Sequence, residues 1–421
     1  MLAKCHDALD KRVFLPEGQS VAFGEAKPTR FLLYDVNPGE GFNLRRDVYM
    51  RIANLVKFLN EEQSWTLVLP PWGNLYHWQT PGLKQTMLPW STFFDISALN
   101  RHIPVIEFMD YLKVIGEPKI EQLYYLQPYE EGWKDGKWEE RMDFRPCIGN
   151  PPYYQDEVDS MWYGWFFGYE DVYAEAFQCV SIQAHAGYLK SFLLHNTTAR
   201  SVFLDHGEEV IHGPYSEFSP VFWTARRSMV FAKHLKNLGD EFREKYLDSI
   251  DEKDKTVMED DWTSVRKQHG DAVGGPYIGV HLRRKDYLRA HPDHVPSLKN
   301  AAKQIKNKLK EFKLNTVYIG TDAPKKEYEE LKGYLSKYKV YRFEPTEEQL
   351  EKYKDGGVAI IDQWINAHSR YFLGSYVSTV SLRTQEEREI LGFKTEMTFN
   401  CLCGDAEPNC TQPAMWPILY E

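Results

Sequence analysis

The sequence predicts an α/β protein with two domains, each built around a parallel sheet. In both halves of the chain, short apolar runs alternate with amphipathic stretches, a pattern typical of doubly wound sheets. The length of 421 residues also exceeds the usual range for a single domain. We therefore expect an N-terminal domain over residues 1–230 and a C-terminal domain over residues 231–421.

The N-terminal half opens with a strand–helix–strand unit. The run "RFLLYDV" (30–36) is apolar and stops before Asn37-Pro38, so it predicts a buried strand. Apolar residues at helical spacing predict an amphipathic helix over 44–62, and "WTLVLPPW" (65–72) predicts a second strand. Such a unit implies parallel strands with a right-handed crossover. Residues 120–225 are rich in aromatic residues and show no regular period, so we expect insertions there.

The C-terminal half alternates more regularly. Strands are predicted over 276–284, 316–323, 339–345 and 370–374, and helices over 297–312, 325–338, 357–369 and 377–392. The charged segment 235–275 is predicted to be a largely helical connection. Because ligands of doubly wound sheets bind beyond the C-terminal ends of the strands, functional residues are expected there.

The composition narrows the class of protein. The net charge is −10, from 51 basic and 61 acidic residues, whereas a general nucleic-acid binder needs a basic surface. No apolar run approaches the roughly 20 residues of a membrane-spanning helix. The first residues also lack the apolar region of a signal peptide. The sequence therefore predicts a soluble globular protein that binds no nucleic acid and does not span a membrane.

Cysteines and glycosylation sequons favour the secretory pathway. No Cys-x-x-Cys is present, so disulfides are favoured over a zinc site. The expected disulfides join Cys147 to Cys179 and Cys403 to Cys410, with Cys5–Cys401 as a third candidate. N-glycosylation sequons begin at Asn196 and Asn409.

The stretch "VNPGEGFNLRRDVY" (36–49) joins the first predicted strand to the first helix, and its two glycines flank Glu40. A glycine loop before a helix is typical of a phosphate cradle. A carboxylate aimed at a diphosphate would repel it, however. Exposed between Gly39 and Gly41, Glu40 is better interpreted as a general base that faces a hydroxyl group.

The motif "HLRRKD" (281–286) follows an apolar strand. Strand alternation points Arg283 and Arg284 to opposite faces, and an arginine fork at a strand end can pair with a diphosphate. The alternative is a surface salt bridge to Asp286. Since no Asp-x-Asp occurs in the chain to hold a divalent ion, the sequence favours metal-free neutralisation of a leaving diphosphate by arginine.

Three further positions in this half carry suggestive chemistry. Asp322 follows a strand and could bind a base or ribose, or cap the helix that starts near Lys325. Asp362 lies in an apolar helix, where a carboxylate needs a partner, either the two N–H donors of a guanine edge or a structural arginine. Hydroxyl residues in 375–381 open a helix, which suits a phosphate or ordinary N-capping.

These motifs carry a family resemblance. "GVHLRRKD" resembles the H-x-R-R-x-D element of the fucosyltransferase superfamily. Five strings resemble the protein O-fucosyltransferases that act on thrombospondin type 1 repeats. They are "DVNPGEGFNLRRDVY", "LVLPPWGNLYHW", "GGPYIGVHLRRKD", "DGGVAIIDQWINAH" and "CLCGD". The resemblance runs from residue 30 to the end.

The resemblance implies a GT-B fold, with two Rossmann-like domains facing across a cleft. It implies inverting, metal-independent transfer of L-fucose from GDP-fucose to Ser or Thr hydroxyls of folded thrombospondin repeats. It further implies a soluble monomer in the endoplasmic reticulum lumen that needs no cofactor, although the C-terminal "LYE" is not a KDEL-type signal. The alternatives are a fucosyltransferase with glycan acceptors and a non-catalytic GDP-sugar-binding chaperone. A Rossmann oxidoreductase ranks low, because no G-x-G-x-x-G follows the first strand.

Family roles map onto this sequence residue by residue. Glu40 corresponds to the base and Arg283 to the diphosphate ligand. The expected GDP-fucose contacts are Gly39, Glu40, Gly41, Phe42, Asn43, His281, Leu282, Arg283, Asp286, Asp362, Thr379 and Val380. The family usually has proline at the position of Gly39 and phenylalanine at that of Val380.

Overall fold

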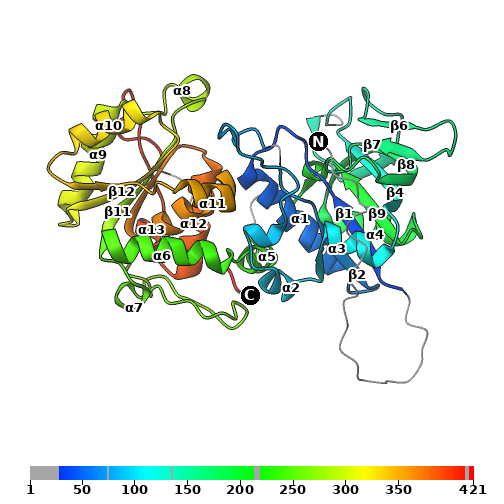
Figure 1. Cartoon of the computed structure of the whole chain (residues 1–421), viewed down its shortest axis with the longest axis horizontal. Helices are drawn as coiled ribbons and strands as arrows, with labels where there is room; N and C mark the ends of the chain where they lie inside the picture. The colour runs from blue at the N-terminus through cyan, green and yellow to red at the C-terminus, as the bar shows by residue number, and fades with distance from the viewer. Residues whose placement is uncertain (1–27, 74, 134–135, 213–218, 413–416) are drawn as a thin grey trace. The chain divides into compact units, whose positions relative to one another are not determined.

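The computed structural model describes residues 28–73, 75–133, 136–212, 219–412 and 417–421 (Figure 1). The described residues fall into two compact units. The first unit holds 28–79, 84–91 and 96–212, and the second holds 80–83, 92–95 and the residues from 219 onward. The domain boundary at residues 230 and 231 stays a prediction.

The first unit is built around a sheet whose strand order is β3-β2-β1-β9-β4-β8-β7-β6, with β5 and β10 also paired to β8. Its parallel strands are β1 (Arg30–Tyr34), β2 (Trp65–Leu69), β3 (Val105–Glu107), β4 (Lys119–Gln127), β8 (Tyr173–His185), β9 (Ser201–Asp205) and β10 (Val210–Ile211). The antiparallel strands are β5 (Arg141–Phe144), β6 (Tyr153–Gln155) and β7 (Trp162–Gly164). The helices are α1 (Phe42–Leu59), α2 (Ile96–Asn100), α3 (Phe108–Ile115) and α4 (Ala186–His195).

The predicted strand–helix–strand unit is confirmed, because β1 and β2 pair in parallel on either side of α1. The segment 120–225 is more regular than the sequence suggested. It supplies most of β4 and all of β8 and β9, which lie in the middle of the sheet, besides the shorter antiparallel strands. The segment therefore contributes central strands of the sheet, which the sequence analysis did not predict.

The second unit contains a parallel sheet with strand order β13-β12-β11-β14-β15. The strands are β11 (Gly275–Leu282), β12 (Thr316–Thr321), β13 (Lys339–Tyr341), β14 (Ser369–Gly374) and β15 (Asn400–Cys401). The helices are α5 (Pro220–Ser228), α6 (Lys233–Leu247), α7 (Asp251–Asp254), α8 (Tyr287–Ala290), α9 (Leu298–Glu311), α10 (Lys325–Tyr334), α11 (Glu347–Ala367), α12 (Thr379–Leu391) and α13 (Thr395–Thr398). The four predicted strands are confirmed to within a few residues. The order reverses between β11 and β14, which defines a topological switch point.

Helix α11 begins ten residues before the predicted start at 357. Thr346 caps its N-terminus by accepting from the Gln349 backbone N–H, and the Gln349 side chain accepts from the Thr346 backbone N–H, which together form a capping box. The helix is interrupted at Lys354, whose φ is 60°. The T-x-x-Q pattern of Thr346 to Gln349 is a local signal for this earlier start, which the sequence analysis missed.

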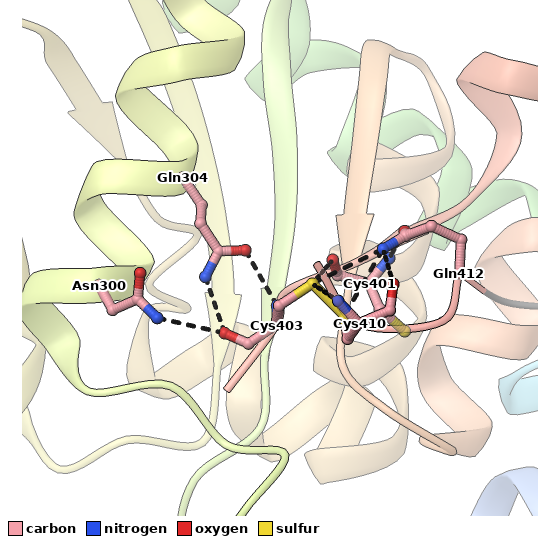
Figure 2. The surroundings of a disulfide bond; sticks show 6 residues. All are labelled: Asn300, Gln304, Cys401, Cys403, Cys410 and Gln412. Carbon is pink, nitrogen blue, oxygen red and sulfur yellow. Dashed lines mark hydrogen bonds between the residues drawn. A yellow bond between two sulfur atoms is a disulfide. The ribbon is translucent and has the colours of Figure 1, made fainter. Parts of the chain in front are cut away.

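The C-terminal segment is tied to α9 around a disulfide (Figure 2). Cys403 is bonded to Cys410, and its backbone is held by Gln304, which donates to the Cys403 carbonyl at 2.8 Å and accepts from its N–H at 2.9 Å. Cys147–Cys179 is also present, so both expected disulfides form. Cys401 is a buried free thiol, so the third bond is not formed in this structure, and Cys5 lies outside the described residues.

Candidate functional site

Polar side chains converge at the switch point of the second unit, where β11 and β14 end. Ser375, the first residue after β14, links the two strands because its Oγ accepts from the Arg283 N–H and donates to the His281 carbonyl, both at 2.9 Å. The Ser375 N–H donates in turn to Ser381 Oγ at 2.9 Å. These bonds fix the backbone from which Arg283 projects.

His281 is a buried, neutral group in this network. Its Nδ1 lies 2.8 Å from Ser381 Oγ, on the first turn of α12. Burial, together with the nearby Arg283 charge, lowers the pKa of His281 to about 3. At neutral pH the imidazole is therefore a hydrogen-bonding group rather than a cation, and the positive charge at this strand end comes from Arg283.

Arg283 lies between two carboxylates that follow two different strands. Its Nη2 donates to Asp286 at 2.6 Å, and its Nη1 is 2.7 Å from an Asp322 oxygen. Arg284 has a separate set of partners, Glu327 at 2.7 Å and the Pro296 carbonyl at 2.8 Å. The expected divergence of the two arginines is consistent with these contacts, because the two guanidinium groups pair with different residues.

Asp322 has a role that the sequence did not predict. Helix α10 is N-capped by Pro324 without a side-chain bond, so the alternative in which Asp322 caps this helix is wrong, and a contact with a base or ribose stays a prediction. Asp322 instead accepts from the Arg284 N–H at 2.7 Å and pairs with Arg283. Burial raises the pKa of Asp322, while the Arg283 charge lowers it. The result is an arginine fork whose orientation is set from both sides.

Asp362 projects from α11 toward β12. It accepts a hydrogen bond from the Tyr318 hydroxyl, so its protein partner is a tyrosine rather than the arginine considered above. Burial raises the pKa of Asp362 to about 6. Within the described chain, its second oxygen forms no hydrogen bond or ion pair, which leaves an acceptor available to a ligand.

The N-terminus of α12 carries the predicted residues Thr379 and Val380. Its N-cap is Ser378, whose side chain makes no capping bond, so the alternative of ordinary side-chain capping is wrong here. The preceding Val377 has a φ of +39°, a left-handed conformation that costs a β-branched residue roughly 1–3 kcal/mol. An uncapped helix N-terminus favours an anion through its N–H groups and its dipole.

The predicted catalytic loop lies in the first unit, between β1 and α1. The Glu40 N–H donates to the Asn37 carbonyl at 2.9 Å, and the Gly39 N–H donates to the Asn37 side chain at 3.0 Å, which closes a tight turn. Neither glycine has a positive φ. A Cβ on Gly41 would lie 3.3 Å from His77, so close approach explains this glycine.

The Glu40 side chain itself is unpaired. Among the residues that the structure describes, its carboxylate takes part in no hydrogen bond or ion pair, and it is partly exposed. Its neighbours Phe42 and Asn43 are buried; Phe42 packs against Trp72, with ring centroids 4.8 Å apart. The loop thus presents one free carboxylate above an anchored helix start.

The structure groups the predicted residues within each unit. His281, Arg283 and Asp286 adjoin the 375–381 segment in the second unit, whereas residues 39–43 form their own group in the first. The Leu282 side chain belongs to the core, so this residue can offer a ligand only its backbone. Sequence reasoning missed Ser375 and Ser381 as individual linking residues, although the hydroxyl-rich string had singled out their segment.

Several general features of the described residues bear on the chemistry. No cluster of three or more His, Cys, Asp or Glu side chains that could hold a metal occurs among them. None of the helices in the described part of the chain is long and apolar enough to cross a membrane. Asn196 and Asn409, the two sequon asparagines, are both exposed.

Comparison with solved structures shows the class of fold. A crystal structure of POFUT1 in complex with GDP-fucose aligns with a TM-score of 0.57, covering 90% of this chain and 99% of that one at 14% sequence identity. The chain therefore has the α/β fold of the GT-B glycosyltransferases.

Sequence comparison narrows this class to a family. The family described as GDP-fucose protein O-fucosyltransferase matches residues 31–391. The human GDP-fucose protein O-fucosyltransferase 2 is 52% identical over 406 residues, covering 96% of this chain and 94% of the relative. The Caenorhabditis elegans protein of the same name is 46% identical, covering 94% and 92%. The chain belongs to the GDP-fucose protein O-fucosyltransferase family and is a glycosyltransferase.

Proposed function

We propose that this protein transfers L-fucose from GDP-fucose to Ser or Thr hydroxyls of folded thrombospondin type 1 repeats. The transfer inverts the sugar configuration, needs no metal and takes place in the endoplasmic reticulum lumen, where the enzyme acts as a monomer. The observation that carries the donor half of this proposal is Arg283, held by Asp286 and Asp322 at the switch point of the second unit. The acceptor class rests on the relatives and motifs described above.

Arg283 and the start of α12 bind the diphosphate. A planar guanidinium can pair with two phosphate oxygens at once, and its orientation is already set before the donor arrives. Negative charge gathers on the β-phosphate as the sugar–oxygen bond breaks, so a preorganised cation stabilises the transition state, often as the largest single contribution. Thr379 and Val380 add backbone N–H groups at the helix N-terminus.

Asp362 binds the guanine edge of the donor. Two N–H donors of guanine match one carboxylate, and the second Asp362 oxygen is available. Burial raises the pKa of Asp362 and so disfavours its ionised form in the protein alone. The guanine N–H groups would supply the hydrogen bonds to this carboxylate that the protein does not. This arrangement favours guanine over bases without that donor pair.

Glu40 is the general base. A Ser or Thr hydroxyl is a weak nucleophile, and removal of its proton as the C–O bond forms typically contributes on the order of 10²–10⁴-fold. An unpaired, partly exposed carboxylate is ready to accept that proton, whereas a carboxylate in an ion pair would first have to release its partner. Gly39 and Gly41 keep side chains away from it.

A transfer assay with folded and with reduced thrombospondin repeats, run in EDTA, tests the proposal. We expect transfer to the folded repeat only. Glu40→Ala should bind GDP-fucose normally and lose transfer by roughly 10²-fold or more, while Glu157→Ala, an exposed glutamate of the same unit, stays active. Arg283→Ala should lose both donor affinity and rate.

The outcomes separate the alternatives. Transfer to free oligosaccharides but not to repeats identifies a glycan-directed fucosyltransferase. Donor binding without any transfer, unaffected by Glu40→Ala, identifies a GDP-sugar-binding chaperone. Loss of transfer in EDTA that is restored by a divalent ion would show that the metal-independent mechanism is wrong.

A further inference from the structure

Arg45, one turn into α1, bridges the whole Glu40 loop. Its Nε donates to the Glu40 carbonyl at 3.2 Å, and its Nη2 donates to the Val36 and Asn37 carbonyls at 2.8 and 3.1 Å. Three carbonyl oxygens spread over the loop therefore meet in one guanidinium. Such a fork has a fixed planar geometry, so it sets the positions of the three carbonyls relative to one another.

The guanidinium is itself held from the opposite side. Its Nη1 donates to Asp35 Oδ1 at 3.1 Å, and Asp35 is almost fully buried at the end of β1. Asp35 is fixed in turn, because it accepts from the Val36 N–H at 2.7 Å and from the Trp165 indole at 2.9 Å. The position of Arg45 is thus determined by the sheet and not only by its own helix.

Besides Arg45, the loop is held by the turn bonds from the Glu40 and Gly39 N–H groups to Asn37. Pro38 and Gly39 are exposed. Beneath Pro38 lies a cavity of about 200 Å³, whose lining includes Asp35, Arg45, Met87 and Trp165. In addition, the Asn37 N–H donates to the Glu208 carboxylate at 3.1 Å. Because Pro38 and Gly39 are exposed, hydrogen bonds rather than side-chain packing fix this part of the loop, and Arg45 supplies three of them.

We propose that Arg45 is a positioning residue that holds Glu40 in its catalytic location through the carbonyls of residues 36, 37 and 40. This inference rests on the proposed function, in which Glu40 is the base. Arg45 touches no reacting atom. Its contribution is geometric, since a base displaced by about 1 Å can lose roughly 10²-fold in rate.

Arg45→Lys separates this geometric role from simple charge pairing. Lysine keeps a cation beside Asp35, so the buried carboxylate is not left uncompensated, but a point charge cannot reproduce the fork. Arg51→Lys is the matched control. Arg51 lies on the same helix, is 18% exposed against 14% for Arg45, pairs with Asp47, and donates to the carbonyls of residues 208 and 210 instead.

Three measurements on the full-length protein test the role: kcat and KM for transfer, the Kd of GDP-fucose by calorimetry, and hydrogen exchange of a peptide covering 36–41. Arg45→Lys should lower kcat by about tenfold to a hundredfold and speed exchange in 36–41. The donor Kd should change less than kcat, because residues 39–43 are only part of the expected donor contacts. Arg51→Lys should change none of these by more than about twofold.

Each contrary outcome is informative. Equal losses of kcat in both variants, or a loss confined to the donor Kd with kcat unchanged, would overturn the positioning role. So would unchanged exchange in 36–41 of Arg45→Lys. If Glu40→Ala keeps its activity, the base assignment fails and the positioning role fails with it. If Glu40→Ala is inactive and Arg45→Lys is fully active, only the positioning role fails.

Discussion

Asp362 illustrates at the scale of one residue how a binding group can lower stability. Its pKa of about 6, against an ordinary value of 3.8, means that the folded protein holds the ionised form at a cost at neutral pH. The Tyr318 hydroxyl offsets part of that cost. A carboxylate in this position is understandable if a ligand supplies the remaining hydrogen-bond donors.

We therefore expect Asp362→Asn to raise the free energy of unfolding at pH 7.5 by on the order of 1–2 kcal/mol while weakening donor binding. A group whose folded pKa is raised makes the native state bind protons more readily, so the wild-type cost disappears as the pH falls from 6 toward 3.8. The gain should consequently shrink by pH 5. Urea denaturation at both pH values measures it, with the exposed Glu348→Gln on α11 as control. A gain of equal size at both pH values would contradict the explanation.

The individual site residues differ in how far sequence could predict them. Arg283 could be found because a charged motif directly follows an apolar strand, which is a local pattern. The partner of Asp362 could not, because Tyr318 is 44 positions away and meets it only through packing of α11 on β12. For Asp322, the local sequence allowed a role as a helix cap. In the structure it forms an ion pair with Arg283, which lies on another strand end and is distant in the sequence.

At the scale of elements, two glycines let α11 and the start of β14 lie close to strands β11 and β12. A Cβ on Gly279 of β11 would lie 2.5 Å from Ser369 Oγ and 2.9 Å from Asn366 Oδ1. A Cβ on Gly320 of β12 would lie 3.0 Å from Asn366 and 3.4 Å from Asp362. Close approach, rather than a positive φ, accounts for both glycines and brings Asp362 to the edge where β12 ends.

We expect Gly279→Ala to destabilise the protein by about 1–3 kcal/mol, as overpacking of a well-packed interior does. Gly320→Ala should cost clearly less, since its neighbours need to move only slightly. The free energies of unfolding of the two variants, measured side by side in urea, test this order. A larger loss for Gly320→Ala would show that the distance to the nearest atom does not set the cost at these two positions.

Element prediction succeeded where the hydrophobic period was unbroken and failed where tertiary pairing decided the structure. Strands β11, β12 and β14 of the second unit are short apolar runs buried on both faces, a strong local signal. In contrast, β8 has a mixed pattern over Tyr173–His185 because it pairs with parallel β4 and antiparallel β5 along its length. Those partners cannot be identified from the strand's own residues.

At the scale of the whole molecule, chain order and compact units do not coincide. Residues 92–95 come early in the sequence yet belong to the second unit. There the Asp95 N–H donates to the Val230 carbonyl and the Ala232 N–H to the Phe93 carbonyl, both at 2.9 Å. Thr80 likewise bonds Asp355 at 2.6 Å. A linear boundary drawn from composition could not predict such exchanges.

Each unit also contains a histidine that burial keeps neutral. His102 in the first unit and His368 in the second both have a pKa lowered to about 3 from 6.5, with desolvation as the main cause. The unfolded chain takes up a proton on such a group near pH 6.5, whereas the folded protein does not. Its contribution to stability is therefore complete above pH 6.5 and is lost as the pH falls toward 3.

The free energy of unfolding of the wild type should fall between pH 7.5 and pH 5.0, partly because His102 takes up a proton on unfolding. We expect this fall to be smaller in His102→Gln by on the order of 1–2 kcal/mol, because the variant no longer has that proton to bind. Urea denaturation of wild type and variant at the two pH values gives the difference, with the exposed His195→Gln as control.

If the two units unfold separately, the effect of His102→Gln should be confined to the unfolding transition of the first unit, and His368→Gln should shift only the transition of the second unit. An equal effect of either variant on one common transition would show that the units unfold together. A His102→Gln variant with the full wild-type pH dependence would mean that His102 already titrates in the native state.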